Sequence, residues 1–268
     1  MELFFRKYGE GTPIVIVHGL YGSSDNWVTI GRRLAENFEV FIIDQRNHGR
    51  SPHSKLHNYD LMVDDLYNFL EKQDIKKAVL VGHSMGGKTV MQFAYQYSEK
   101  VSALIVLDIV PKSYVQIAKK NESEISHYGI LKAMKDVNFS IINNRKDVDR
   151  ELEKVIKNIR IRQFLLKNIH RDKDNSLSWG LNVEALYNGL DEILNGMDTG
   201  LYHTGDAITG FPVLFIRGAN SKYILDGDIE RIETIFPYAE LKTIDNAGHW
   251  LHAEQPQKLV SLIEDFLN

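Results

Sequence analysis

The sequence predicts an α/β protein with a mostly parallel, doubly wound sheet and a helical segment inserted into it. Short β-rich apolar runs alternate with helix-length segments in the first half of the chain. A long charged stretch without such runs follows, and two further runs close the pattern. Because strands that alternate with helices imply right-handed crossovers, the sheet is expected to be parallel.

Six short runs predict the strands of this sheet. Apolar runs of about four residues are typical of parallel strands that helices cover on both faces. The apolar runs lie at residues 14–17, 40–43, 78–81, 104–107 and 213–216, and a further strand is predicted at residues 240–244, where polar and apolar residues are mixed.

Between Pro111 and Gly210 we expect no comparable strand, because this stretch is charged and helical in composition. Residues 147–166 carry apolar side chains at helical spacing. A structureless loop of this length is implausible in a compact domain. We therefore expect a core domain from residues 1–110 and 208–268, with residues 111–207 forming an inserted helical cap.

Composition excludes several classes of function. With 268 residues, 43% of them hydrophobic and 25% charged, the chain has the composition of an ordinary globular protein. A net charge of −4 offers no broad basic surface for nucleic acid. The absence of cysteine excludes disulfides, thiolate zinc sites and a cysteine nucleophile. No apolar run is long enough to span a membrane, and no signal-peptide pattern opens the chain. We expect a cytoplasmic protein, and its oligomeric state stays open.

The strongest chemical signal is the sequence GHSMGG at residues 82–87, between the third predicted strand and a helix. It satisfies G-x-S-x-G, in which serine occupies a sharp strand-to-helix turn and side chains in place of the glycines would collide with backbone. Ser84 would then lie at a helix N-terminus, where free N–H groups favour developing negative charge. Ser84 is the candidate nucleophile.

The same segment also matches a nucleotide-binding motif. Residues 82–89, GHSMGGKT, satisfy the phosphate-loop pattern, and Asp108 could pass for the acidic residue that holds magnesium in such proteins. A phosphate loop gives no reason for the remaining signals, so we keep this interpretation only as a remote alternative.

A serine nucleophile needs a base and donors for the oxyanion. His249 follows the last predicted strand, beside Gly248, and comes after the serine in the chain order of this architecture. His252 is a second candidate base. The turn that begins at His18 ends the first core strand, and it predicts the amide of Leu20 as one oxyanion donor and that of Met85 as the other.

Together these residues resemble the α/β-hydrolase superfamily, and more narrowly the YbfF-type group of bacterial acyl-esterases. The resemblance covers nearly the whole chain. It is carried by HGLYGSSDNW (18–27), DQRNHGRSP (44–52), GHSMGG (82–87), LDIVP (107–111) and AGHW (247–250), with RQFLLK (162–167) in the inserted segment. The resemblance implies an α/β-hydrolase fold, Ser84 as nucleophile, His249 as base and a cap that shapes the acyl pocket.

A catalytic triad also needs an acid that bonds the histidine base, and the sequence offers two candidates for it. Many α/β-hydrolases carry it after the penultimate strand, but residues 217–221 contain no carboxylate and the next one is Asp226. Asp108 follows the fourth core strand, so it should reach the same sheet edge as Ser84. YbfF-like enzymes are similar in taking the acid from this strand. We predict Asp108, with Asp226 as the alternative.

The predicted function is a carboxylesterase-type serine hydrolase that cleaves small to medium acyl esters or thioesters without cofactor or metal. Carbon–carbon bond hydrolysis or lysis, perhydrolysis and a non-enzymatic ligand-sensing role stay open, because a fold does not decide among them. His53 and His57 have a metal-like spacing but lack the glutamate of H-E-x-x-H. The residues expected to line the substrate pocket are Tyr21, Trp27, Tyr114, Trp179, Leu186 and Trp250.

Overall fold

A seven-stranded sheet forms the centre of the molecule. The structure is a computed structural model that describes residues 1–115, 126–142, 144–196 and 206–268. Within these residues the strand order is β1-β3-β2-β4-β5-β8-β9, and only β1 runs antiparallel to its neighbour. The strands are β1 (Phe5–Tyr8), β2 (Pro13–Val17), β3 (Glu39–Ile43), β4 (Ala78–His83), β5 (Val101–Leu107), β8 (Val213–Gly218) and β9 (Ala239–Ile244).

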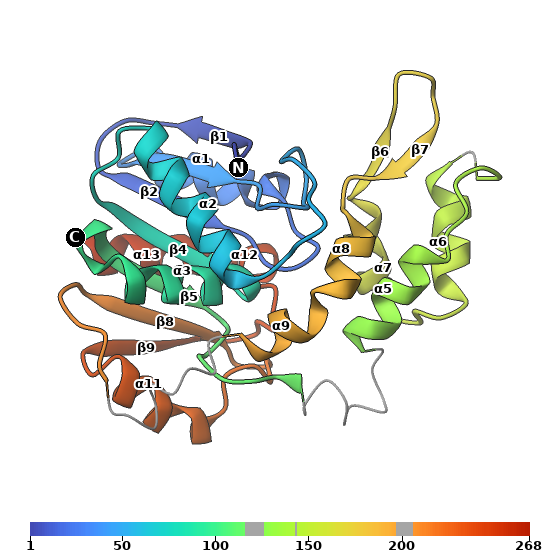
Figure 1. Cartoon of the computed structure of the whole chain (residues 1–268). Helices are drawn as coiled ribbons and strands as arrows, with labels where there is room; N and C mark the ends of the chain where they lie inside the picture. The colour runs from blue at the N-terminus through green and yellow to red at the C-terminus, as the bar shows by residue number, and fades with distance from the viewer. Residues whose placement is uncertain (116–125, 143, 197–205) are drawn as a thin grey trace.

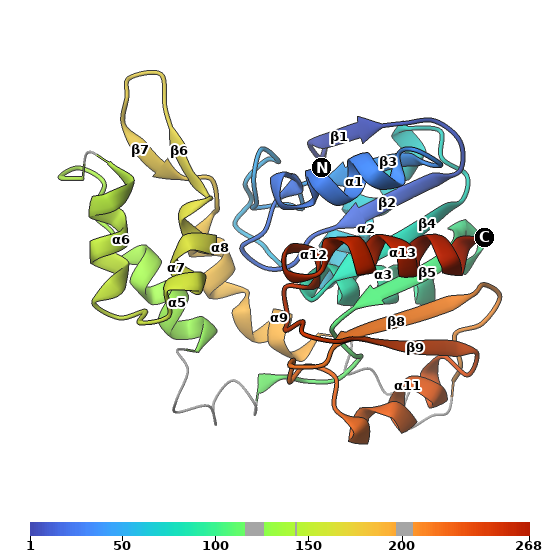
Figure 2. The ribbon, with the colours of Figure 1, turned by 180° about the vertical axis from the view of Figure 1, so that it is seen from behind.

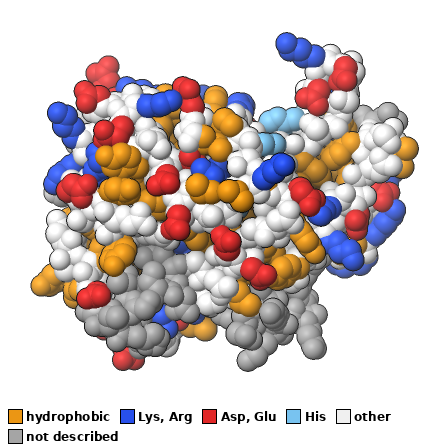
Figure 3. Space-filling model, viewed as in Figure 1, with side chains coloured by type: hydrophobic (Ala, Val, Ile, Leu, Met, Phe, Trp, Pro, Cys, Tyr) orange, Lys and Arg blue, Asp and Glu red, His pale blue; other side chains and the backbone are white. Residues whose placement is uncertain are grey.

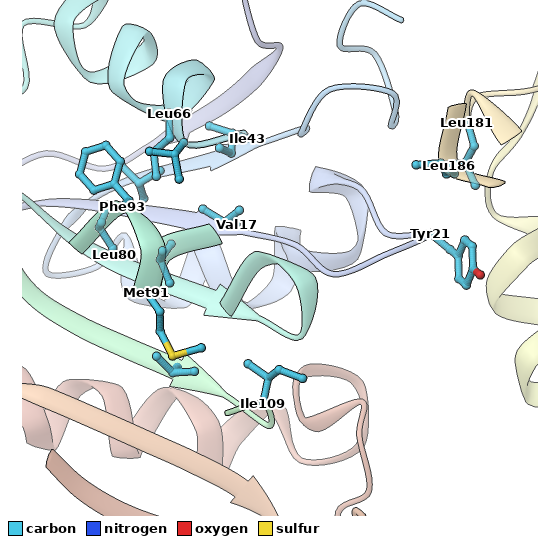
Figure 4. Close-up of a cluster of buried hydrophobic side chains, with 14 of the residues drawn as sticks. Val17, Tyr21, Ile43, Leu66, Leu80, Met91, Phe93, Ile109, Leu181 and Leu186 are labelled. Atoms are coloured by element: carbon cyan, nitrogen blue, oxygen red, sulfur yellow. The ribbon is translucent and has the colours of Figure 1, made fainter. Parts of the chain in front are cut away.

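Helices cover both faces of the sheet because alternate strand residues are apolar on each side (Figures 1 and 2). Val15 and Val17 pack in one cluster with α2 (Tyr59–Lys72), α3 (Met85–Gln96) and α11 (Ile229–Ile235). Ile14 and Ile16 pack on the opposite face with α1 (Val28–Leu34) and α13 (Pro256–Leu267). Figure 4 shows side chains of α2 and α3 directed at the first of these faces, among them Leu66 and Phe93.

The segment between β5 and β8 forms a separate layer of short elements beside the sheet, here called the insertion (described residues of 111–207; Figure 1). It meets the core at loops that follow strands, since Asn168 bonds Tyr21 after β2, and Asn182 bonds Asn47 after β3. Its elements are α5 (His127–Lys135), α6 (Arg145–Glu153), α7 (Ile159–Leu166), β6 (Ile169–Arg171), β7 (Leu177–Trp179), α8 (Val183–Asn188) and α9 (Leu190–Asn195).

The predicted α/β class and all six predicted strands agree with the structure. The expectation that the insertion lacks strands is wrong in one place, because β6 and β7 pair as a short antiparallel hairpin whose turn contains Asn175 with a positive φ. Each of these strands has only three residues, too few to leave a period-two pattern. The domain limits 1–110, 111–207 and 208–268 stay a prediction.

The strand register brings the loops that follow four strands to one edge of the sheet. Val17 pairs with Gly82, His83 pairs with Leu107, and Leu107 pairs with Ile216. Because these strands are parallel, β2, β4, β5 and β8 all end at this edge. Ligands of open parallel sheets bind outside the carboxyl ends of the strands, so the register indicates where a site should lie.

On the face seen in Figure 3, acidic and basic side chains are interspersed over the drawn part of the core. This distribution agrees with the net charge of −4. It gives no continuous positive stripe on this face, such as would follow a nucleic-acid backbone.

The turn between β4 and α3 requires glycine at position 86. A Cβ atom there would lie 2.2 Å from the carbonyl oxygen of Val17, so the backbone of β2 or α3 would have to move. We expect Gly86→Ala to lower the free energy of unfolding by about 1–3 kcal/mol, the usual cost of overpacking. Chemical denaturation of both proteins measures this change.

Gly227→Ala is the matched control for Gly86→Ala. A Cβ atom at position 227 meets nothing within 4 Å, so the expected change is within about 0.5 kcal/mol. Equal destabilisation by the two substitutions would contradict the assignment of a close packing role to Gly86.

Candidate active site

Ser84 occupies a strained turn between β4 and α3. Its backbone has φ 53° and ψ −118°, values that residues other than glycine rarely adopt. The Ser84 N–H donates to the carbonyl of Leu107 over 3.0 Å, which ties the turn to the end of β5. The residue lies just before the first turn of α3, and it lines a cavity between the core and the insertion.

Asp108 lies at the end of β5 and is fully buried. Its Oδ2 is 2.7 Å from Nδ1 of His249 and also accepts a hydrogen bond from the hydroxyl of Ser221, while Oδ1 accepts from the Gly218 N–H over 3.1 Å. Both carboxylate oxygens therefore have donors, as a buried charge requires.

The imidazole of His249 is held on several sides. Its ring stacks on that of Tyr223 with centroids 3.8 Å apart and planes 16° from parallel, and its carbonyl oxygen is 2.7 Å from Nε2 of His83. Since Nδ1 bonds Asp108, the ring presents Nε2 away from the carboxylate. His249 and Ser84 line the same cavity without a direct hydrogen bond between their side chains.

Residues Gly19–Gly22 form the turn that follows β2. The Gly22 N–H donates to the Gly19 carbonyl over 2.9 Å, and Tyr21 has a φ of 63°. The Tyr21 N–H is occupied, since it donates to Nε2 of His48 over 3.3 Å. The Leu20 amide is not a donor in any turn, loop or cap hydrogen bond of the described residues, and neither is the Met85 amide. Both are therefore available to a ligand.

The cavity that contains Ser84 has a volume of about 320 Å³. Its walls come from the turn after β2, the loops after β4 and β9, and the insertion residues of α5 and α7. A second hollow of about 730 Å³ adjoins it and shares six wall residues with it, namely Asn26, Arg160, Phe164, Trp250, His252 and Glu254.

Half of the predicted pocket residues line this cavity: Tyr21, Trp27 and Trp250 do, whereas Tyr114, Trp179 and Leu186 do not. Tyr114 is buried below the site and donates to the Tyr223 carbonyl over 2.7 Å. The indole N–H of Trp179 donates to the carbonyl of Met134 within the insertion, and Leu186 is fully buried in the apolar cluster. The prediction for these three is wrong, because apolar side chains of an inserted helical layer also pack on one another.

Two alternative assignments are also corrected. The side chain of Asp226 is 85% exposed and forms an ion pair with Arg217, so it lies away from His249. His252 does line the cavity, but its ring stacks on Trp27 with centroids 4.4 Å apart and has no contact with Asp108. The base and acid that the geometry pairs are therefore His249 and Asp108.

The phosphate-loop interpretation is also wrong. Such a loop needs its lysine beside the phosphates, but Lys88 is buried. Its Nζ donates to the carbonyls of Lys112 and Leu194 over 2.8 and 3.2 Å and lies over the ring of Tyr114. This ammonium group fastens α3 to the insertion and cannot reach a ligand at the turn.

Three residues at the site were not predicted from the sequence. Tyr223 stacks on the base, His127 lines the cavity from the insertion, and Asn168 bonds the turn after β2. The contacts of Asn168 and His127 span more than 90 positions of sequence, whereas Tyr223 stacks on a base that follows the next strand, β9. No local motif could have indicated them, although the aromatic residue shortly after Ser221 was a weak signal.

Comparison with known proteins places this arrangement in a family. A family model described as the alpha/beta hydrolase fold matches residues 12–128. A Danio rerio protein named sn-1-specific diacylglycerol lipase ABHD11 is 36% identical over 269 residues, which cover 98% of this chain and 80% of that protein. This chain belongs to the α/β-hydrolase family.

Further comparisons agree with this assignment. Esterase YbfF of Escherichia coli is 33% identical to this α/β-hydrolase over 257 residues, 96% of this chain and 93% of that one. A solved structure titled marine microorganism esterase has 42% identity, a TM-score of 0.89 and 99% coverage of both chains. The predicted resemblance to the YbfF-type group is therefore confirmed.

Among the described residues, no helix of this α/β-hydrolase has both the length and the apolar character needed to cross a bilayer.

Burial of His252 makes stability depend on pH. Burial first, then repulsion from His249, lowers the pKa of His252 to about 3. The unfolded chain binds this proton below about pH 6.5 and the folded chain does not, so the free energy of unfolding falls as pH drops through the window from about 6.5 to 3. The variant His252→Phe keeps an aromatic ring on Trp27 but removes the titrating imidazole. When pH is lowered from 7.5 to 5, we expect its free energy of unfolding to fall by about 2 kcal/mol less than that of the wild type.

Chemical denaturation at the two pH values measures the difference. His53→Phe is the control, because that ring is more exposed and its pKa is lowered to a smaller extent. Identical pH dependence in wild type and His252→Phe would show that the buried imidazole does not contribute.

Proposed function

We propose that this protein is a serine hydrolase of the carboxylesterase type, which cleaves esters or thioesters of small to medium acyl groups through an acyl-enzyme intermediate. The observation that carries the proposal is the Asp108–His249 hydrogen bond at a cavity that Ser84 also lines. The names of its relatives, which include esterases and a lipase, support ester bonds as the target.

In the acylation half-reaction, Ser84 Oγ attacks the carbonyl carbon while Nε2 of His249 takes its proton. Asp108 stabilises the imidazolium through the 2.7 Å contact with Nδ1. The N–H groups of Leu20 and Met85 hold the oxyanion, and the N-terminus of α3 favours the negative charge. His249 then gives its proton to the leaving alcohol or thiol as the bond to the carbonyl carbon breaks.

In the deacylation half-reaction, His249 takes a proton from water, which attacks the acyl-enzyme. The tetrahedral intermediate collapses, the acid leaves, and Ser84 recovers its proton from His249. Burial lowers the pKa values of the neighbouring His83 and His252, so both stay neutral at pH 7. Neither adds a positive charge that would oppose the imidazolium of His249.

The size of the cavity supports a modest acyl group. A volume of about 320 Å³ lies at the lower end of the usual range for small-molecule sites. We propose residues 111–207 as the cap that closes this cavity over the sheet edge. Placement in the cytoplasm stays a prediction from the sequence.

Other reactions of the same scaffold remain rivals to be tested. Carbon–carbon bond hydrolysis or lysis and perhydrolysis would use the same nucleophile, and a ligand-sensing protein would keep the pocket without turnover. No feature of the described residues favours one of these over ester hydrolysis.

The direct test of the proposal uses p-nitrophenyl esters from acetate to octanoate. We expect turnover by the wild type and a fall of about 10⁶ in kcat for Ser84→Ala. A fluorophosphonate should label Ser84 covalently. Comparable activity of wild type and variant would eliminate the serine mechanism, and the absence of turnover on every ester would favour the sensing role.

The acid is tested by a matched pair of variants. Asp108→Asn keeps the shape but removes the charge that stabilises the imidazolium, so kcat should fall by about 10⁴. Asp226→Asn removes an exposed carboxylate and should leave kcat within about twofold. Steady-state kinetics on one ester decides between them. Loss of activity only in Asp226→Asn would overturn the assignment of Asp108.

A further inference from the structure

Tyr21 has an unfavourable backbone conformation at a position that matters for the proposed chemistry. It is buried and has a φ of 63°, which costs about 1–2 kcal/mol for a residue with a side chain. It follows Leu20, the proposed oxyanion donor, within the turn closed by Gly19 and Gly22. Such a conformation persists only where surrounding contacts hold it.

Three polar groups of Tyr21 have partners, and two of those partners come from the insertion. Its N–H donates to His48 Nε2 in the core, its carbonyl accepts from Asn168 Nδ2 over 2.9 Å, and its hydroxyl is 3.2 Å from His127 Nδ1. Figure 4 shows the Tyr21 side chain reaching away from the sheet toward the insertion.

Asn168 is well placed to hold the turn. It is 5% exposed and lies between α7 and β6, where its N–H donates to the Leu165 carbonyl and its carbonyl accepts from the N–H of Gly180, just after β7. Its side-chain amide points Nδ2 at two carbonyls, those of Tyr21 and Leu165. His127 supports the same turn, since its Nδ1 lies 3.2 Å from the Tyr21 hydroxyl and its backbone carbonyl accepts from that hydroxyl over 3.4 Å, while burial lowers the pKa of its ring to about 4.

These contacts fix both peptide groups that flank Tyr21. The N–H of Tyr21 is part of the Leu20–Tyr21 peptide group, and the carbonyl of Tyr21 is part of the Tyr21–Gly22 peptide group. Because both peptide groups are held, Tyr21 cannot change from its positive φ to a right-handed conformation unless Leu20 and its N–H also move. A misplacement of about 1 Å in such a group can cost about 10² in rate.

We propose that Asn168 of the insertion is a positioning residue for the oxyanion hole, which it holds through the Tyr21 carbonyl with support from His127. The proposal rests on the proposed function, because it takes the Leu20 N–H as an oxyanion donor. The insertion thus serves the chemical step itself as well as the shape of the pocket.

The test replaces the amide donor by an acceptor of the same shape. Asn168→Asp places a carboxylate oxygen opposite the Tyr21 carbonyl, so the turn loses its hold. We expect kcat for p-nitrophenyl acetate to fall about 10- to 100-fold with KM within about threefold. Affinity for a trifluoromethyl ketone, which forms a tetrahedral adduct with Ser84, should fall by the same factor as kcat/KM.

Asn182→Asp is the matched control for docking of the insertion. The Asn182 side chain also crosses to the core, where Nδ2 donates to Asn47 Oδ1 and the Ser54 carbonyl, but it does not contact the turn. The Asn182 side chain caps the N-terminus of α8 by accepting from the Ala185 N–H, and an aspartate side chain at this position can accept the same hydrogen bond. We expect kcat of this variant to stay within about threefold of the wild type.

Several outcomes would overturn the proposal. One is an unchanged kcat in Asn168→Asp, and another is a rise in KM alone. A third is an equal loss of kcat in Asn182→Asp, which would show that any weakened contact between the insertion and the core lowers the rate. Thermal unfolding verifies that each variant is folded, and Asn168→Ala removes the same donor without a charge if the aspartate variant does not fold. Activity retained in Ser84→Ala would instead overturn the proposed function.

Discussion

One buried carboxylate organises the edge of the sheet on which the proposed chemistry depends. Asp108 follows β5 and accepts hydrogen bonds from Gly218 at the end of β8, from Ser221 just after β8 and from His249 after β9. Three loops are thereby tied to a single charge inside the protein. A charge at this depth is tolerated because each oxygen has donors, and removing any donor would leave part of it unsatisfied.

Much of this arrangement could be predicted from the sequence, because strands buried on both faces leave apolar runs and parallel strands end at a common edge. That is why Ser84 and Asp108 could be brought together from their positions alone. Strand β1 was missed, since it is short, partly exposed and antiparallel. The contacts of Asn168 and Tyr223 could not be predicted, because they join distant segments without a local pattern. Apolar composition likewise gave no means to separate pocket residues from packing residues such as Leu186.

The insertion and the core are joined by polar contacts at the loops that follow β2 and β3. Asn47, in the segment DQRNHGRSP, accepts from Asn182 and from Ser54 N, while Asn168 bonds the turn after β2. This segment therefore ties loops together across the boundary between the two parts of the molecule. Shape complementarity alone would let the insertion slide, whereas directional bonds set its position over the cavity.

Five described loops at the carboxyl edge contain a residue with a side chain and a positive φ, and three of these residues belong to the proposed site: Tyr21, Ser84 and Asp108. Glycine would relieve the strain at each position but would remove the hydroxyl, the carboxylate or the ring. Selection for thermal stability alone would therefore favour replacements that remove groups on which the proposed mechanism depends. In the proposed mechanism, reactivity is tied to the strained edge of the sheet, so heat-resistant variants are better sought on the opposite edge, where the strands begin.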